Sequence, residues 1–175
     1  YDMKLETLQS LKERRSIRAY QKEQIKEDEL QAVLEAGMYA PTSMGKQSPK
    51  MVVVQDPETV HVLSEMNREI MGVEFDPFYG APTIVIVFAE SEETPHIEDA
   101  SLVMGNLMNG AYAVGLGSCW IHRARQMFKS EAGQEFMKKW GIPESYKGVG
   151  ICILGYPACE HPEPKARKAD YVVRA

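Results

Sequence analysis

The sequence is poor in cysteine, with only Cys119, Cys152 and Cys159 among 175 residues. An odd and sparse set does not suit a disulfide framework, and the first two lie inside apolar runs, as reduced buried thiols do. The three cysteines and four histidines show no CxxC, HExxH or EF-hand spacing, so we expect no metal site. We expect a cytoplasmic protein, because reduced thiols persist there.

Excess positive charge is lacking too, since 20 Lys and Arg face 25 Asp and Glu, for a net charge of −5. A nucleic-acid surface needs a basic face, so no nucleic-acid partner is expected. There is no GxSxG elbow around an activated nucleophile, and the Gly115–Gly117 segment follows an apolar helical run instead of opening one. This position excludes the dinucleotide-binding fingerprint.

Long charge-free runs are rare, and the exception is the stretch from Ala100 to Ile121. Apolar spacing predicts a long core helix over 100–114 with apolar residues on all its faces, followed by a strand over 118–121. Asn106, Asn109 and four glycines argue against a membrane span, because lipid offers the amides no partner. We therefore expect a helix surrounded by protein.

The remaining periodicity predicts a mixture of helices and strands in one domain over residues 1–175. Helices are expected over 3–14 and 27–38, and after the capping residues Asp56 and Ser130. Strands are expected over 51–55, 83–89, 149–154 and 171–173. This order indicates an α+β sandwich with a central sheet covered on both faces.

Three polar segments are candidates for binding, although each also has an ordinary explanation. RRSIR at 14–18 suits a phosphate, but basic residues at a helix end also complement its dipole. The loop 40–47 can be a surface turn, and the basic residues of 164–168 can be solvated.

These segments resemble the nitroreductase family of flavin-dependent oxidoreductases when they are taken together, in order. The matching stretches are RRSIR, APTSMGKQSP, DASLVMGNLMNGAYAVGLGSCWI and PKARK. The resemblance implies a dimeric three-layer α+β sandwich with a central mixed, mainly antiparallel sheet and a long buried core helix. It also implies a homodimer with FMN at two sites in the interface.

The resemblance also assigns cofactor contacts to residues of this chain. Those implied for the FMN phosphate and ribityl chain are Arg14, Arg15, Ser16, Arg18, Lys165 and Arg167. Those implied near the flavin ring are Pro41, Thr42, Ser43 and Gln47 from the other subunit, Asn67 at the pyrimidine edge, and Ile121, His122 and Arg123 beside N5. Gly45 stands where the family often has Asn, and the Lys that many members place near flavin N1 has no match.

The implied activity is ping-pong transfer of hydride from NADH or NADPH to flavin N5, and then to a nitroaromatic, a quinone or a related electrophile. The flavin would carry this chemistry, so no catalytic side chain is expected. Two alternatives remain open from the sequence. One is a flavin-binding or sensory module without turnover, and the other is the same fold acting as a flavin dehydrogenase or reductive dehalogenase.

Overall fold

The computed structural model describes residues 3–175 and contains a four-stranded sheet in the order β1-β2-β4-β3. Its strands are β1 (Lys50–Val54), β2 (Thr83–Glu90), β3 (Gly117–Ile121) and β4 (Tyr146–Gly155). All three strand pairings are antiparallel. Parallel pairing in the described residues is limited to one isolated bridge between Ser16 and Ser118. The mainly antiparallel sheet is confirmed, and its expected mixed character is reduced to that bridge.

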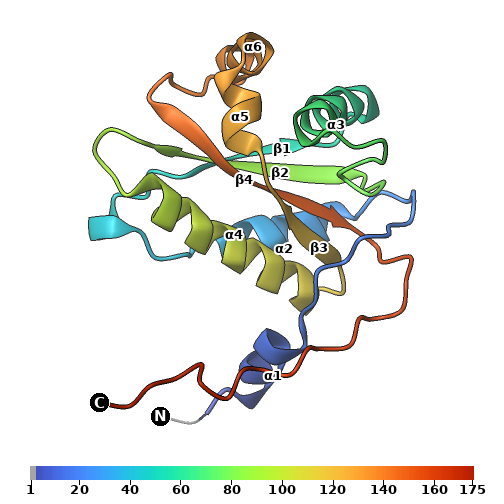
Figure 1. Cartoon of the computed structure of the whole chain (residues 1–175), viewed down its shortest axis with the longest axis vertical. Helices are drawn as coiled ribbons and strands as arrows, with labels where there is room; N and C mark the ends of the chain where they lie inside the picture. The colour runs from blue at the N-terminus through green and yellow to red at the C-terminus, as the bar shows by residue number, and fades with distance from the viewer. Residues whose placement is uncertain (1–2) are drawn as a thin grey trace.

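Helices cover both faces of this sheet (Figure 1). One layer contains α2 (Glu27–Met38) and α4 (His96–Ala113), which pack on one apolar cluster. The other layer contains α3 (Pro57–Met71), α5 (Ala124–Lys129) and α6 (Glu131–Lys139), which pack on a second cluster. The expected three-layer α+β sandwich is confirmed.

The central strand β2 explains the continuous apolar run in the sequence, because both of its faces are covered. Ile84, Ile86 and Phe88 point into the cluster under α3, α5 and α6. Val85 and Val87 point into the cluster under α2 and α4. All five are fully buried, so a strand without alternation is what this position requires.

The two predicted helix caps are present. The side chain of Asp56 accepts a hydrogen bond from the amide of Thr59 at 2.9 Å, and Ser130 accepts one from the amide of Gly133 at 3.1 Å. Each satisfies an N–H group that the first turn of a helix leaves free. Helix α5 was not predicted, because six residues are too few to show a clear period.

The expected core helix is present as α4, which the chain by itself covers on one face, whereas the expected strand in the tail is wrong. Helix α4 packs only its inner face on α2 and the sheet, and it leaves Ile97 and Leu102 about half exposed, at 51% and 49%. Residues 171–173 form no strand and are exposed. A strand requires a hydrogen-bonded neighbour, and no residue of 3–175 pairs with them as a strand.

Helix α1 (Leu5–Glu13) and the C-terminal tail (158–175) lie outside the sandwich, at the same end (Figure 1). The His161 Nε2 atom donates a hydrogen bond to the Glu13 carbonyl oxygen at 2.7 Å and so connects them. Helix α1 buries none of its residues. Among the described residues, no helix is long and apolar enough to cross a membrane.

Candidate functional site

The site is organised around the turn that follows the edge strand β3. After Ile121 the chain passes through His122 and enters α5 at Arg123, whose backbone has a left-handed φ of 77°. This conformation is uncommon for a residue other than glycine and has to be supported by its surroundings. Within residues 3–175, the amides of His122 and Arg123 find no hydrogen-bond acceptor. The turn therefore offers two free N–H donors.

Asn67 of α3 holds this turn in place through hydrogen bonds from its side chain. Its side chain is fully buried. Its Nδ2 atom donates to the His122 carbonyl oxygen at 2.8 Å, and its Oδ1 atom accepts from Arg123 Nε at 3.0 Å. The amide thus holds both residues of the turn. The contact with a flavin pyrimidine edge that the resemblance implies for Asn67 stays a prediction.

The RRSIR segment runs beside β3 at the opposite end of the same strand. The amide of Ile17 donates to the Ser118 carbonyl oxygen at 2.9 Å. This close approach depends on Gly117, since a Cβ atom there would lie 3.0 Å from Ile17 Cβ. The segment is therefore held against the sheet by backbone contacts, and the Arg15 side chain is fixed by hydrogen bonds from its Nη1 atom to the carbonyl oxygens of Lys12 and Arg14, at 2.8 and 2.5 Å.

A small cavity of about 90 Å³ lies between this segment and α4. Its lining includes Arg14, Arg15, Tyr112, Ser118 and His161. The Arg14 Nη1 and Arg15 Nε atoms are buried and have no hydrogen-bond partner in the described residues. Buried guanidinium nitrogens without partners are costly. The arrangement suits an anion that accepts from both arginines.

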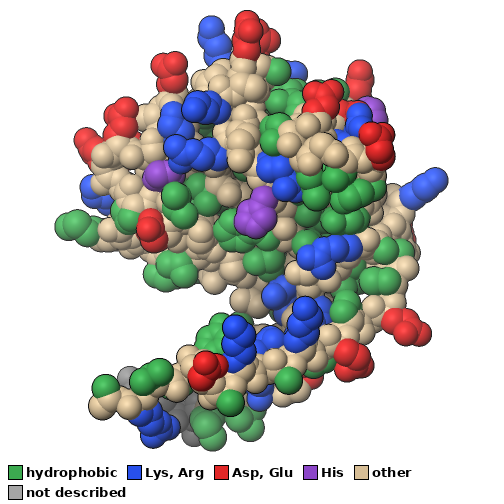
Figure 2. Space-filling view, in the orientation of Figure 1, with side chains coloured by type: hydrophobic (Ala, Val, Ile, Leu, Met, Phe, Trp, Pro, Cys, Tyr) green, Lys and Arg blue, Asp and Glu red, His purple; other side chains and the backbone are tan. Residues whose placement is uncertain are grey.

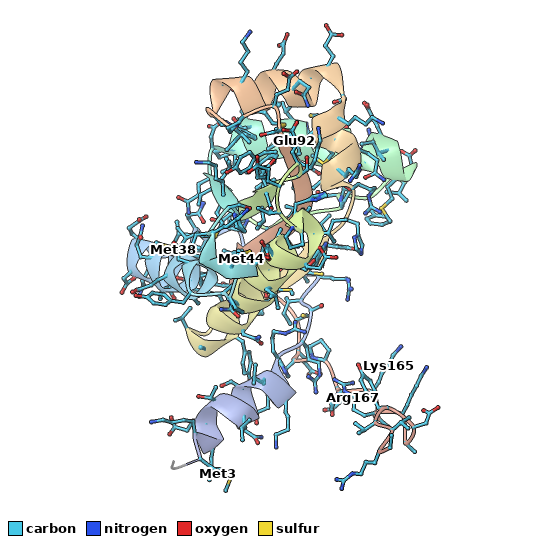
Figure 3. All side chains as sticks on the ribbon, turned by 90° about the vertical axis from the view of Figure 1, so that its left-hand side faces the viewer. Met3, Met38, Met44, Glu92, Lys165 and Arg167 are labelled. Carbon is cyan, nitrogen blue, oxygen red and sulfur yellow. The ribbon has the colours of Figure 1, made fainter. Side chains whose placement is uncertain are left out.

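The other predicted phosphate contacts are not gathered at this cavity. Ser16 and Arg18 are outside its lining, and Arg18 is exposed because the extended chain alternates about the buried Ile17. Lys165 and Arg167 lie on the exposed tail, away from the sandwich (Figure 3). Of the tail residues, only His161 lines the cavity.

The loop 40–47 lies at the far end of α4 and is held in an unusual conformation. Its predicted residues Pro41, Thr42 and Gln47 line a cleft of about 680 Å³ between α2 and α4. The amide of Ser43 donates to Asp99 Oδ1, and the amide of Gln47 donates to the Thr42 hydroxyl, both at 3.0 Å. Within one chain, this loop is therefore held in a fixed conformation away from the cavity at Arg14 and Arg15.

Left-handed residues within the loop explain its glycine. Met44, Gly45 and Gln47 have φ values of 51°, 63° and 53°. Gly45 takes this conformation without strain, and the Asn that the family often has there also tolerates it. Gly45 in place of the family's Asn therefore removes a side chain and keeps the left-handed backbone conformation.

Sequence reasoning missed the role of Asp99. An acidic residue in the first turn of a helix is normally explained by the helix dipole alone, but Asp99 is buried, with 3% of its surface exposed. One of its oxygens holds the loop at Ser43, and Oδ2 has no partner in the described residues. No local pattern indicates this contact, because Ser43 and Asp99 are far apart in the sequence.

Hydrogen bonds also tie α1 to the sandwich. The Tyr112 hydroxyl of α4 donates to Glu13 Oε2 at 3.0 Å. Hydrogen bonds from Gln9 and then from Tyr112 lower the pKa of Glu13, and the same contact raises the pKa of Tyr112. The cavity edge at Tyr112 is thus held in place while Glu13 is ionised.

Comparison with known proteins gives consistent matches over this framework. The sequence pattern of the Nitroreductase family matches residues 11–76 and 58–156. A protein of Archaeoglobus fulgidus with the provisional name NADH dehydrogenase/NAD(P)H nitroreductase is 28% identical, over 89% of this chain and 87% of its own length.

Two solved structures share the fold over almost the whole chain. A nitroreductase from Bacteroides fragilis with bound FMN is 29% identical, with a TM-score of 0.89 over 97% of this chain and 98% of that chain. A nitroreductase from Desulfitobacterium hafniense with bound FMN is 25% identical, with a TM-score of 0.87 over 99% and 100%. With the family pattern matched over most of its length, the chain belongs to the nitroreductase family.

Proposed function

We propose that the chain is an FMN-dependent oxidoreductase that uses NADH or NADPH to reduce nitroaromatics, quinones or related electrophiles. The names of its relatives support this reading, since they refer to NAD(P)H nitroreductase and FMN reductase activity, and solved neighbours contain FMN. We also propose that residues 1–175 form one domain, and that its free, largely buried cysteines reflect a cytoplasmic location.

The observation that carries the proposal is the fit between FMN and the polar groups that lack partners. The buried nitrogens of Arg14 and Arg15 would bind the phosphate, because a guanidinium group suits phosphate oxygens. The free amides of His122 and Arg123 would face the ring. Bound FMN would supply the redox chemistry by accepting a hydride at N5 and passing it on.

The residues of this chain would position the cofactor and exclude water, without donating a proton from a side chain. Asn67 keeps the 122–123 turn in one conformation, so its amides need no reorganisation during the reaction. We expect no catalytic side chain. Without the Lys that many members place near N1, the reduced flavin anion loses one stabilising charge, so we expect a low redox potential.

We further propose a homodimer with the flavin sites at its interface. Apolar side chains that this chain leaves exposed gather on α1, on the outer face of α4, near the loop 40–47 and on the tail; they include Leu5, Leu8, Leu11, Met38, Met44, Leu102, Tyr171 and Val173. Met38, at the end of α2, and Met44, in the loop that follows, are labelled in Figure 3. A second copy would bury them and bring its loop 41–47 to the flavin. We expect a buried area of about 2,000 Å² or more.

The test is spectroscopic. The freshly purified protein should be a yellow dimer, and stopped-flow mixing with NADH or NADPH should bleach the flavin band within seconds. Steady-state kinetics with an electrophilic acceptor should give the parallel lines of a ping-pong mechanism. A flavin that stays oxidised in the presence of both reductants would refute the activity, and intersecting lines at saturating FMN would refute a shared site.

A further inference from the structure

A second cavity, of about 190 Å³, lies on the α5 side of the sheet. Its cations are Arg125 and Lys129 of α5 and Lys147 of β4, and the rest of its lining consists of Phe128, Gln134, Tyr146 and Gly148. No carboxylate lines it. Figure 2 shows Lys and Arg side chains gathered over this part of the molecule. The cavity is therefore a local basic site in a chain whose net charge is −5.

The packing of α5 on β4 determines where these cations lie. Arg125 and Lys129 are four residues apart and so share one face of α5. Helix α5 lies directly on β4 at Gly148, where a Cβ atom would approach the Ala124 carbonyl oxygen to 2.9 Å. Any other residue at 148 would push the helix away. Lys147 comes next to Gly148 and pairs with Ala89 of the cluster under α2 and α4, so its side chain leaves β4 on the other face, and Lys147 lines the cavity from its edge.

The charges of this cluster are not compensated within the described residues. The two ion pairs found there both belong to Arg68, and none of the three cations makes a side-chain hydrogen bond there. Lys50 adds a further positive charge, with its Nζ atom 5.9 Å from the centre of the Tyr146 ring. Like charges around one concavity attract an anion and focus its approach.

The cavity is also close to the turn that would face the flavin. Arg123 is the N-cap residue of α5, and Lys129 lies six residues further along, or about 9 Å from the turn. On the sheet, Ile121 pairs with Ile151, and Lys147 precedes Ile151 by four residues, or about 13 Å. The basic site is therefore within reach of a long ligand whose reacting end lies at the turn.

We propose that this cavity binds a phosphate group of the reduced nicotinamide dinucleotide while its nicotinamide lies at the 122–123 turn. The proposal rests on the proposed function and adds a binding site for the co-substrate. Lys129 and Arg125 are exposed and Lys147 is partly exposed, in contrast to the buried nitrogens of Arg14 and Arg15. An open site suits a co-substrate that must leave in every cycle, whereas a closed one suits a resident cofactor.

The test uses the FMN-loaded protein and the variants Arg125→Ala, Lys129→Ala and Lys147→Ala, singly and combined. The matched control is Lys138→Ala with Lys139→Ala, which removes two cations from α6 outside the cavity. Stopped-flow reduction of the flavin gives an apparent Kd for NADH, for NADPH and for the phosphate-free donor 1-benzyl-1,4-dihydronicotinamide. FMN content, read from absorbance, verifies that the variants keep their cofactor.

We expect each single substitution to raise the Kd of a dinucleotide several-fold, and the triple variant to raise it by about tenfold or more. The effect shrinks as salt increases, because the site is open to solvent. The phosphate-free donor and the control show no change. A loss for NADH and NADPH alike assigns the site to the pyrophosphate, and a loss for NADPH alone assigns it to the 2′-phosphate.

Unchanged Kd values for both dinucleotides, or equal losses for the phosphate-free donor, would overturn this inference and leave the proposed function standing. A wild-type flavin that no donor reduces, the phosphate-free one included, would instead refute the proposed function and this inference with it. The two failures are therefore distinguishable in one set of measurements.

Discussion

The sandwich and the two segments outside it, α1 (Leu5–Glu13) and the tail (158–175), which we call the arms, both contain apolar side chains. These side chains are buried in the sandwich and exposed in the arms. In β2, seven of eight residues are buried, whereas α1 buries none of its residues despite the regular leucines Leu5, Leu8 and Leu11. The hydrophobic effect acts on both, since apolar area in water is unfavourable wherever it occurs. A periodic apolar face therefore predicts that the face is buried, but the pattern does not show whether the same chain or a partner buries it.

The largest effect should come from breaking the arms. Leu8 and Leu11 are about half exposed in the single chain, so a second copy that covers them would gain about half of the 1.5–3 kcal/mol of a full leucine burial at each. Replacing both with Glu in both subunits should therefore make dimer dissociation at least about a hundredfold easier. Sedimentation at micromolar concentration should then show monomer. The matched control is Val62→Glu on α3, which is similarly exposed and should leave the dimer intact; equal effects would remove the distinction between arms and sandwich.

A core substitution tests the other side of the comparison. Phe88 is fully buried and packs edge-on against Phe128, with ring centres 4.9 Å apart. Phe88→Ala should lower the free energy of unfolding by about 3–5 kcal/mol, in the wild type and in the Leu8→Glu, Leu11→Glu background alike. Urea denaturation measures it. A cost below 1 kcal/mol in the monomeric background would mean that the sandwich depends on its partner.

The cavity lined by Arg14 and Arg15 can be compared with Lys165 of the tail by the loss of FMN affinity when each residue is replaced. Arg14→Ala should weaken FMN by about 1.5–3 kcal/mol and riboflavin little, because only FMN has a phosphate. Arg18→Ala should cost less, since Arg18 lies outside the cavity. If Lys165 reaches the same phosphate in the dimer, Lys165→Ala combined with Arg14→Ala should show coupling.

Flavin fluorescence quenching measures both ligands. Equal losses of FMN and riboflavin in Arg14→Ala would place this arginine away from the phosphate. If the losses of FMN binding free energy in Arg14→Ala and Lys165→Ala simply add in the double variant, the two residues do not bind the same phosphate. The tail would then lie away from the cavity in the dimer as well.

The smallest effect concerns the turn itself. Asn67→Ala removes the donor to His122 and the acceptor for Arg123, and it should lower the free energy of unfolding by about 1–3 kcal/mol. Asn67→Asp keeps an acceptor for Arg123 and should cost less. Thermal unfolding followed by circular dichroism measures the difference. Equal costs for the two variants would show that the Arg123 contact contributes little to the left-handed turn.

Most of the fold was predictable from local pattern. The β2 run, the caps at Asp56 and Ser130 and the amphipathic helices follow from side-chain period and capping chemistry, which act within a few residues. Helix α5 was missed because it is short, and the strand at 171–173 was wrong because a strand needs a neighbour. A six-residue helix is too short for its period to be recognised, and the pairing of a strand depends on residues distant in the sequence.

The candidate site was predictable only through resemblance. Nothing in RRSIR indicates that two of its guanidinium nitrogens are buried without partners, and nothing near Asn67 indicates its contacts with a turn about 55 residues away. Likewise, Arg125, Lys129 and Lys147 form a cluster only because Gly148 lets α5 lie on β4.

The helices, the central strands and the presence of apolar faces too large to remain in water follow from the amino-acid sequence, because they depend on the period and chemistry of neighbouring residues. Which charges meet, which amides lack a partner and which apolar faces this chain leaves uncovered depend on how the elements pack. The physical reason is that charges, hydrogen bonds and burial depend on distances in space, and the packing of α3, α4 and α5 on one sheet sets those distances.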